Sequence, residues 1–190
     1  LLTKATIETN FGNIEFGLLP DLAPETVRNF TKLAESEFYN GTLFHRVIPG
    51  FMIQGGDHNT KLYPDNPSNW GRGNPDYSLE AEFNDIKHNR GILSMARSPD
   101  PNSAGSQFFI VHNDSTFLDG QYTVFGRLIT AEGFETLDKI ASIQTGPNDV
   151  PIDHEATKII DTKIFDRSDI DNLLELDPPE RTTGTITSPT

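Results

Sequence analysis

The sequence of 190 residues contains no cysteine, one tryptophan and two methionines. Without cysteine the chain cannot form disulfides, thiolate zinc sites or a cysteine nucleophile. No apolar run approaches the ~20 residues of a membrane-spanning helix, so no membrane span is expected. Basic residues are also scarce, because 15 Lys and Arg stand against 28 Asp and Glu. The net charge of −13 would repel nucleic acid, so nucleic-acid binding is not expected.

Length and composition fit one globular domain, which buries roughly 70% of the surface of its unfolded chain. We expect this domain to span residues 1–167 and to be a monomer. Residues 168–190 are acidic, contain Pro178-Pro179 and end in Thr, Ser, Gly and Pro, which predicts a partly disordered tail. An anchor or partner-binding segment is the alternative for this tail. The chain opens at Leu1, so an exported form with a trimmed leader stays open beside the favoured cytoplasmic location.

Hydrophobic periodicity predicts more strands than helices. Alternating residues 5–18 predict a hairpin around the turn at residues 10–13. From Pro24 the period becomes helical, which predicts a helix that ends before Asn40. Short β runs occupy residues 43–54, whereas residues 58–78 follow neither period and predict a long loop. Further strands are expected over residues 91–96, 107–112, 123–128 and 157–165, and a second helix over 134–141.

Two segments combine glutamine with aromatic residues. Arg46 and Gln54 stand in the apolar run FHRVIPGFMIQGGD, residues 44–57, without a nucleophile beside them. An arginine in such a strand would ordinarily lie on its rim and pair with a surface carboxylate. Extended structure would place Met52 and Gln54 on one face, and the segment Ser106-Gln107-Phe108-Phe109 repeats the combination. If these strands converge, they form an apolar pocket with a few polar donors, with Phe108 in the core.

The five histidines do not carry the spacing of a metal site. None forms an i,i+4 pair around a glutamate, and none has a cysteine partner. We expect structural or surface roles for them, and neither a metal nor an organic cofactor.

Several motifs in consistent order resemble one family. The run at residues 44–57 resembles the signature of the cyclophilin family of peptidyl-prolyl cis-trans isomerases, and so do GSQFFI, FLDG and VFG at 105–110, 117–120 and 124–126. The resemblance spans residues 3–165. It implies a mainly β fold, an eight-stranded antiparallel β-barrel capped by two α-helices, which agrees with the periodicity.

The resemblance also implies site residues. It assigns catalytic roles to Arg46, Gln54 and Phe51, and substrate-binding roles to Met52, Ala96, Arg97, Gln107, Phe109, Phe117, Leu118 and Tyr122. The segment Ala96-Arg97-Ser98 matches the strand that holds the substrate backbone. Arg97 replaces a common asparagine, which we expect to change side-chain preference only. Many cyclophilins have tryptophan at Phe117, where it contributes to cyclosporin binding, and histidine at Tyr122, so weakened cyclosporin binding is expected.

The implied activity is rotation of X-Pro bonds in peptides and protein clients, which assists folding and needs no covalent intermediate. Rotation is slow because it breaks amide resonance. In the twisted transition state the prolyl nitrogen regains a lone pair, which a fixed donor such as Arg46 could bind. A proline-peptide binding module that uses the same groove is the alternative. We also expect the loop at residues 58–77 to shape this groove beyond the proline pocket.

Overall fold

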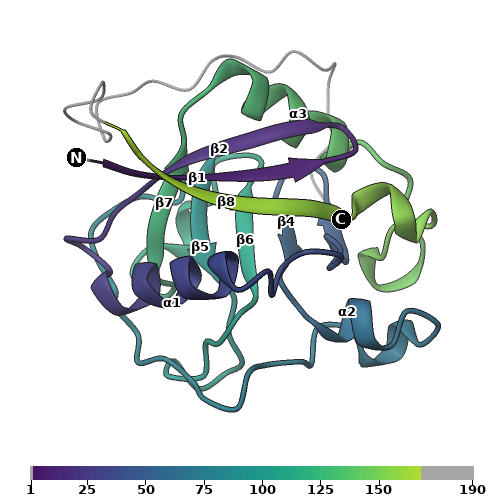
Figure 1. Cartoon of the computed structure of the whole chain (residues 1–190), viewed down its shortest axis with the longest axis horizontal. Coiled ribbons are helices and arrows are strands. Elements are labelled where there is room, and N and C mark those ends of the chain that lie inside the picture. The colour runs from purple at the N-terminus through teal and green to yellow at the C-terminus, as the bar shows by residue number, and fades with distance from the viewer. Residues whose placement is uncertain (1, 168–190) are drawn as a thin grey trace.

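The computed structural model describes residues 2–167, so the predicted tail at 168–190 lies outside the described residues. Within this range one curled sheet contains all eight strands (Figure 1). The strands are β1 (Leu2–Thr9), β2 (Gly12–Leu18), β3 (Arg46–Ile48), β4 (Met52–Gly55), β5 (Ile92–Met95), β6 (Phe108–Val111), β7 (Val124–Leu128) and β8 (Ile159–Arg167). The predicted hairpin is the pair β1–β2, with Ile7 opposite Ile14.

The strand order is β3-β4-β6-β5-β7-β2-β1-β8, and each neighbouring pair is antiparallel. The edge strands β3 and β8 approach one another through the segments that precede them. Leu43 bridges to Lys158, and the Gly41 N–H donates to the Ile159 carbonyl at 2.8 Å. The predicted eight-stranded antiparallel fold is confirmed, as a half-barrel whose open side is joined by this short bridge.

Two long helices, α1 (Pro24–Glu35) and α3 (Ala131–Ala141), lie on opposite sides of the sheet (Figure 1). Proline opens α1 as predicted, because the missing N–H has no intrahelical partner in a first turn. The Thr130 hydroxyl accepts a hydrogen bond from the Gly133 N–H at 3.0 Å and caps α3. Both helices bury their apolar stripes against the sheet, so both predicted helices are confirmed.

An aromatic cluster fills the space between α1 and the sheet. The ring of Phe30 lies 5.7 Å from that of Phe108 and 5.3 Å from that of Phe125, and Tyr39 packs edge-on to Phe108 at 5.4 Å. Phe108 is fully buried, which confirms its predicted place in the core. Tilted and edge-on pairs of this kind add stabilisation beyond the buried area.

The segment at residues 58–78 differs from the predicted loop in containing two helical turns, α2 (Asn59–Leu62) and a 3-10 turn at Pro67–Asn69. Its organising group is the fully buried carboxylate of Asp57. This carboxylate accepts hydrogen bonds from the backbone N–H groups of Asn59 at 2.8 Å, Gly71 at 2.6 Å and Gly73 at 3.2 Å. Local periodicity cannot show this order, because a single side chain joins backbone groups far apart in the sequence.

A buried ionic cluster ties α3 to the sheet. The Arg90 guanidinium donates to both oxygens of Asp138, at 2.7 and 3.0 Å. His112 lies with Nε2 3.0 Å from Asp138 and accepts from the Gly50 N–H through Nδ1. Burial raises the pKa of Asp138, but hydrogen bonds from His112 and Arg90 outweigh it and hold that pKa below its usual value. His112 therefore has a structural role, as predicted.

Candidate active site

A small cavity of about 150 Å³ collects most of the predicted site residues. Its lining consists of Arg46, Phe51, Met52, Gln54, Ala96, Arg97, Phe109, Leu118 and Tyr122. Every lining residue is among the site residues predicted from the sequence. The remaining two predicted residues, Gln107 and Phe117, lie beside this small cavity rather than on its wall.

The sheet register places the central residues of the small cavity. Arg46 on β3 pairs with Gln54 on β4, Gln54 pairs with Phe109 on β6, and Phe109 pairs with Ser94 on β5. Residues directly opposite one another on antiparallel strands present their side chains to the same face. Four residues spread over 64 positions of the chain, from 46 to 109, therefore form one row across the sheet.

The apolar wall is largely buried before any ligand binds. Met52, Phe109 and Leu118 are buried, whereas Phe51 is partly exposed. The ring of Phe51 lies 5.4 Å from that of Phe117, whose side chain is 66% exposed. Phe117 thus extends the apolar surface outward from the rim of the cavity.

The two glutamines form a polar chain along one side. Gln54 donates from Nε2 to Oε1 of Gln107 at 3.0 Å, and Gln107 donates to the Gly73 carbonyl at 2.9 Å. Arg46 is exposed, and no hydrogen bond or ion pair joins its side chain to another of residues 2–167. The surface carboxylate that an ordinary rim arginine would find is thus missing from the described part of the chain.

The side chain of Arg97 is held by hydrogen bonds to backbone carbonyls and by contact with an aromatic ring. Its Nε donates to the Gln121 carbonyl at 2.9 Å, and its Nη1 donates to the Ser98 carbonyl at 3.0 Å. The guanidinium also lies 4.7 Å above the ring centre of Tyr122, a favourable cation–π geometry. Arg97 therefore links two walls of the small cavity, a role that its sequence context did not predict.

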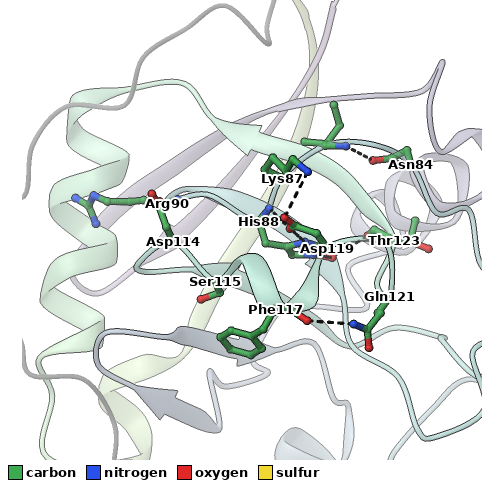
Figure 2. Close-up of polar contacts among 12 residues, drawn as sticks. Asn84, Lys87, His88, Arg90, Asp114, Ser115, Phe117, Asp119, Gln121 and Thr123 are labelled. Carbon is green, nitrogen blue, oxygen red and sulfur yellow. Dashed lines mark hydrogen bonds and ion pairs between the residues drawn. The ribbon is translucent and has the colours of Figure 1, made fainter.

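A polar network lies directly behind Phe109. The His88 ring stacks on Phe109 at 5.9 Å, with Nδ1 3.0 Å from Asp119 and Nε2 3.0 Å from the Ser94 hydroxyl. Figure 2 shows Asp119 beside His88 and Lys87, on the segment that also carries Phe117. Burial lowers the pKa of His88 despite the opposing charge of Asp119. A neutral ring thus supports Phe109, and no local sequence signal predicted this contact.

A large cavity of about 800 Å³ lies next to the small one and shares Arg46 and Gln54 with it. Two loops supply most of its walls, at residues 67–72 and 146–154. Trp70 donates from Nε1 to the Tyr63 carbonyl at 3.0 Å, and its ring packs against His154 at 4.8 Å. The motifs did not predict these lining residues, although the single tryptophan of the chain inside a Gly- and Pro-rich segment was a usable signal.

A third cavity of about 220 Å³ extends from Gln54 past Arg72, Arg97 and Gln107.

Within residues 2–167, no three His, Asp or Glu side chains are grouped so as to hold a metal ion. The helices in the described range are too short or too polar to cross a membrane.

A family model described as cyclophilin type peptidyl-prolyl cis-trans isomerase/CLD matches residues 4–164. The chain belongs to this family. Among the cyclophilins of known structure, the enzyme of Cryptosporidium parvum has 35% sequence identity and a TM-score of 0.76, and the match covers 88% of this chain and 100% of that one. A second structure of that enzyme, in the presence of the dipeptide Ala-Pro, has 36% identity and a TM-score of 0.75 over 86% of this chain and 99% of that one.

Curated relatives are also named as peptidyl-prolyl cis-trans isomerases. Peptidyl-prolyl cis-trans isomerase CYP18-1 of Arabidopsis thaliana is 44% identical over 155 residues, which cover 78% of this chain and 89% of the relative. A Streptococcus pyogenes protein, named as bifunctional phosphatase and peptidyl-prolyl cis-trans isomerase, is 40% identical over 86% of this chain. The match covers only 39% of the Streptococcus protein, whereas cyclophilins such as CYP18-1 are matched over most of their length.

Proposed function

We propose that this cyclophilin isomerises X-Pro peptide bonds in the small cavity, with Arg46 as the catalytic donor. The observation that carries the proposal is the row Arg46–Gln54–Phe109, which puts a guanidinium without a partner among residues 2–167 beside an apolar pocket. The proline ring would sit against Phe51, Met52, Phe109 and Leu118. Because the pocket is small, it suits one compact ring rather than a long side chain.

Arg46 would act on the reacting nitrogen. As the amide twists, the prolyl nitrogen becomes pyramidal and regains a lone pair that the planar ground state lacks. A donor aimed at this lone pair binds the transition state more strongly than the substrate, which is the requirement for catalysis. Arginine stays protonated throughout the physiological pH range, so it can donate at any of these pH values.

The backbone of the substrate would be held from two sides. The N–H of Arg97 donates to no carbonyl within residues 2–167 and stands at the cavity wall, where a peptide carbonyl could accept from it. The Gln54 side chain is tied to Gln107 and makes no hydrogen bond to the Arg46 guanidinium, which favours the hypothesis that it orients a substrate carbonyl rather than the guanidinium. Such positioning restricts rotation to the one bond that has to turn.

The required rate enhancement is modest. Uncatalysed exchange proceeds at ~0.01 per second, and a typical enzyme turns over ~10 times per second. The difference is about a thousandfold, or about 4 kcal/mol. One well-placed donor contributes ~3 kcal/mol in other enzymes, and exclusion of water from the amide adds to it. Unfolded or loosely folded proteins with exposed X-Pro bonds are the clients we propose.

The test compares Arg46→Ala with Arg28→Ala, which removes an exposed arginine on α1. Isomerisation of an Ala-Pro peptide is followed by exchange NMR. We expect Arg46→Ala to lower kcat/KM by about 100-fold to 1,000-fold, and Arg28→Ala to leave it unchanged. Saturable peptide binding without acceleration by the parent protein would instead establish a proline-peptide binding module.

A further inference from the structure

The large cavity differs from its surroundings in charge. Arg46 and Arg72 both line it, and neither side chain has a hydrogen bond or ion pair to any of residues 2–167. Among the residues that the structure describes, no Asp or Glu lines the large, small or third cavity. This is unexpected in a chain with 28 acidic residues and a net charge of −13. Carboxylates line a neighbouring cavity instead, at Asp65, Asp153 and Glu155.

Arg72 stands on a fixed piece of backbone. The buried Asp57 carboxylate accepts from the N–H of Gly71 and from that of Gly73, the two residues that flank Arg72. Gly73 lies so close to this carboxylate that a Cβ atom there would be 2.0 Å from Asp57 Oδ1. The loop is therefore held at the base of the Arg72 side chain, which leaves only side-chain freedom to be lost on binding.

The opposite wall is equally well supported. Trp70 is buried and bonded through its indole N–H, and it packs on His154 from the other loop. Pro67, Pro147 and Pro151 also line the cavity and restrict the backbone of both loops. A preformed cavity loses less free energy when it orders a ligand than a mobile surface does.

We propose that the large cavity binds one flank of the X-Pro substrate and selects a chain that carries an acidic side chain there, with Arg72 as the residue that determines this specificity. The inference rests on the proposed isomerase function and adds a substrate class to it. The carboxylate would sit between Arg46 and Arg72, where a bidentate arginine contact is available.

Continuity with the small cavity identifies the occupant as part of the same substrate chain. Arg46 and Gln54 line both cavities, so a peptide whose proline enters the small cavity crosses directly into the large one. A volume of about 800 Å³ accommodates several residues of that flank. Arg46 and Arg72, whose side chains have no partner among residues 2–167, then face the side chains of that flank, and a carboxylate there would offset part of their positive charge.

The test uses short peptides with a central Ala-Pro that carry Asp or the isosteric Asn at each flanking position in turn. Exchange NMR gives kcat/KM, and chemical-shift titration of the same samples gives Kd. At one flank we expect the kcat/KM of the Asp peptide to exceed that of its Asn partner by about threefold to tenfold. The preference should shrink in high salt, because the arginines are solvent-exposed.

Arg72→Gln should bring the Asp-to-Asn ratio close to one, and Arg72→Lys should retain part of it. Lys139→Gln is the matched control, because it removes one exposed positive charge on α3, away from the cavities. Lys139→Gln should leave the rates with the Asp and the Asn peptide unchanged. A fall in the ratio with Lys139→Gln as large as with Arg72→Gln would indicate a long-range effect of net charge and overturn the proposal.

Equal rates and equal Kd values for the Asp and Asn peptides at every position would also overturn the proposal, and so would a preference that survives Arg72→Gln. These results leave isomerisation of the Asn peptide intact, so they differ from a failure of the proposed function. In that case neither peptide would be accelerated by the parent protein.

Discussion

The two cavities that share Arg46 and Gln54 are built in different ways. The central residues of the small cavity form a row fixed by the register of β3, β4 and β6, and the segments that connect the strands complete its wall. The walls of the large cavity come mainly from two loops, held by the buried Asp57 carboxylate and by contact between Trp70 and His154. Hydrogen-bonded register leaves little room for variation, whereas loops tolerate it.

We propose that this difference reflects a division of tasks. Rotation about an X-Pro bond makes the same demand in every substrate, and a rigid sheet can meet it. Recognition of the flanking residues differs between clients, and loops can change without disturbing the sheet. Arg46 stands on the boundary, where it can serve both the reaction and the flank.

Of the changes considered, truncation of Phe109 should have the largest effect, because it removes part of the wall of the small cavity. Phe109 is 5% exposed and packs against the rings of both His88 and Tyr122. We expect Phe109→Ala to lower the free energy of unfolding by about 3–5 kcal/mol, since it leaves a void. With the proline ring poorly placed, kcat/KM should fall ~100-fold for Asp and Asn peptides alike.

Urea denaturation and exchange NMR measure the two consequences of Phe109→Ala. Phe109→Leu is the control, because it refills part of the void and should recover part of both quantities. An effect confined to the Asp peptide would contradict the assignment of Phe109 to the small cavity.

Acid should destabilise the wall of the large cavity. His45 lines that cavity with a side chain that is 4% exposed, and burial lowers its pKa to about 4 while the charge of Asp57 opposes the shift. Neither ring nitrogen has a partner with hydrogen-bond geometry in the described chain, although the Leu43 backbone favours the charged form. The folded protein therefore stays neutral at His45 at a pH where the unfolded chain, with an ordinary pKa of ~6.5, is protonated.

Stability falls at acid pH because the unfolded state takes up a proton that the folded state does not. Between pH 6.5 and 4 the unfolded chain binds one more proton, so the free energy of unfolding should fall by about 1.4 kcal/mol per pH unit, or about 3 kcal/mol in all. His88, whose pKa burial also lowers, acts in the same direction. Urea denaturation at pH 7 and pH 4.5 measures the loss. His45→Gln should reduce the slope by about 1.4 kcal/mol per pH unit and leave the share of His88, and an unchanged slope in that variant would refute the assignment.

Weakening the contacts of Asp57 with the loop that carries Arg72 should have the smallest effect of these three changes. It tests whether this loop supports only the large cavity. We expect Asp57→Asn to lower the free energy of unfolding by about 2 kcal/mol, because a charged acceptor of three backbone N–H bonds becomes a neutral one. The Asp-to-Asn peptide ratio should fall more than the rate with the Asn peptide. Denaturation and the peptide pair measure both quantities, and an equal loss for the two peptides would show that the loop also supports the small cavity.

Much of this architecture could be predicted because its signals are local. The proline at 24 and the apolar period after it predicted α1, and alternation predicted the hairpin β1–β2. The residues around the small cavity were predicted from motifs in consecutive segments. The support of Phe109 by His88 and Asp119 was not, because these residues are far apart in the chain and meet only through packing.

The sequence by itself determined the family, the eight strands and two long helices, and the residues that surround the small cavity, since period and motif are properties of neighbouring residues. Only the tertiary structure decided that Arg46 also borders a second, larger cavity and that Asp57 holds the loop that carries Arg72. The physical reason is that one buried carboxylate and a few inter-loop contacts fix that cavity. Such contacts join residues whose separation in the chain carries no periodic signal.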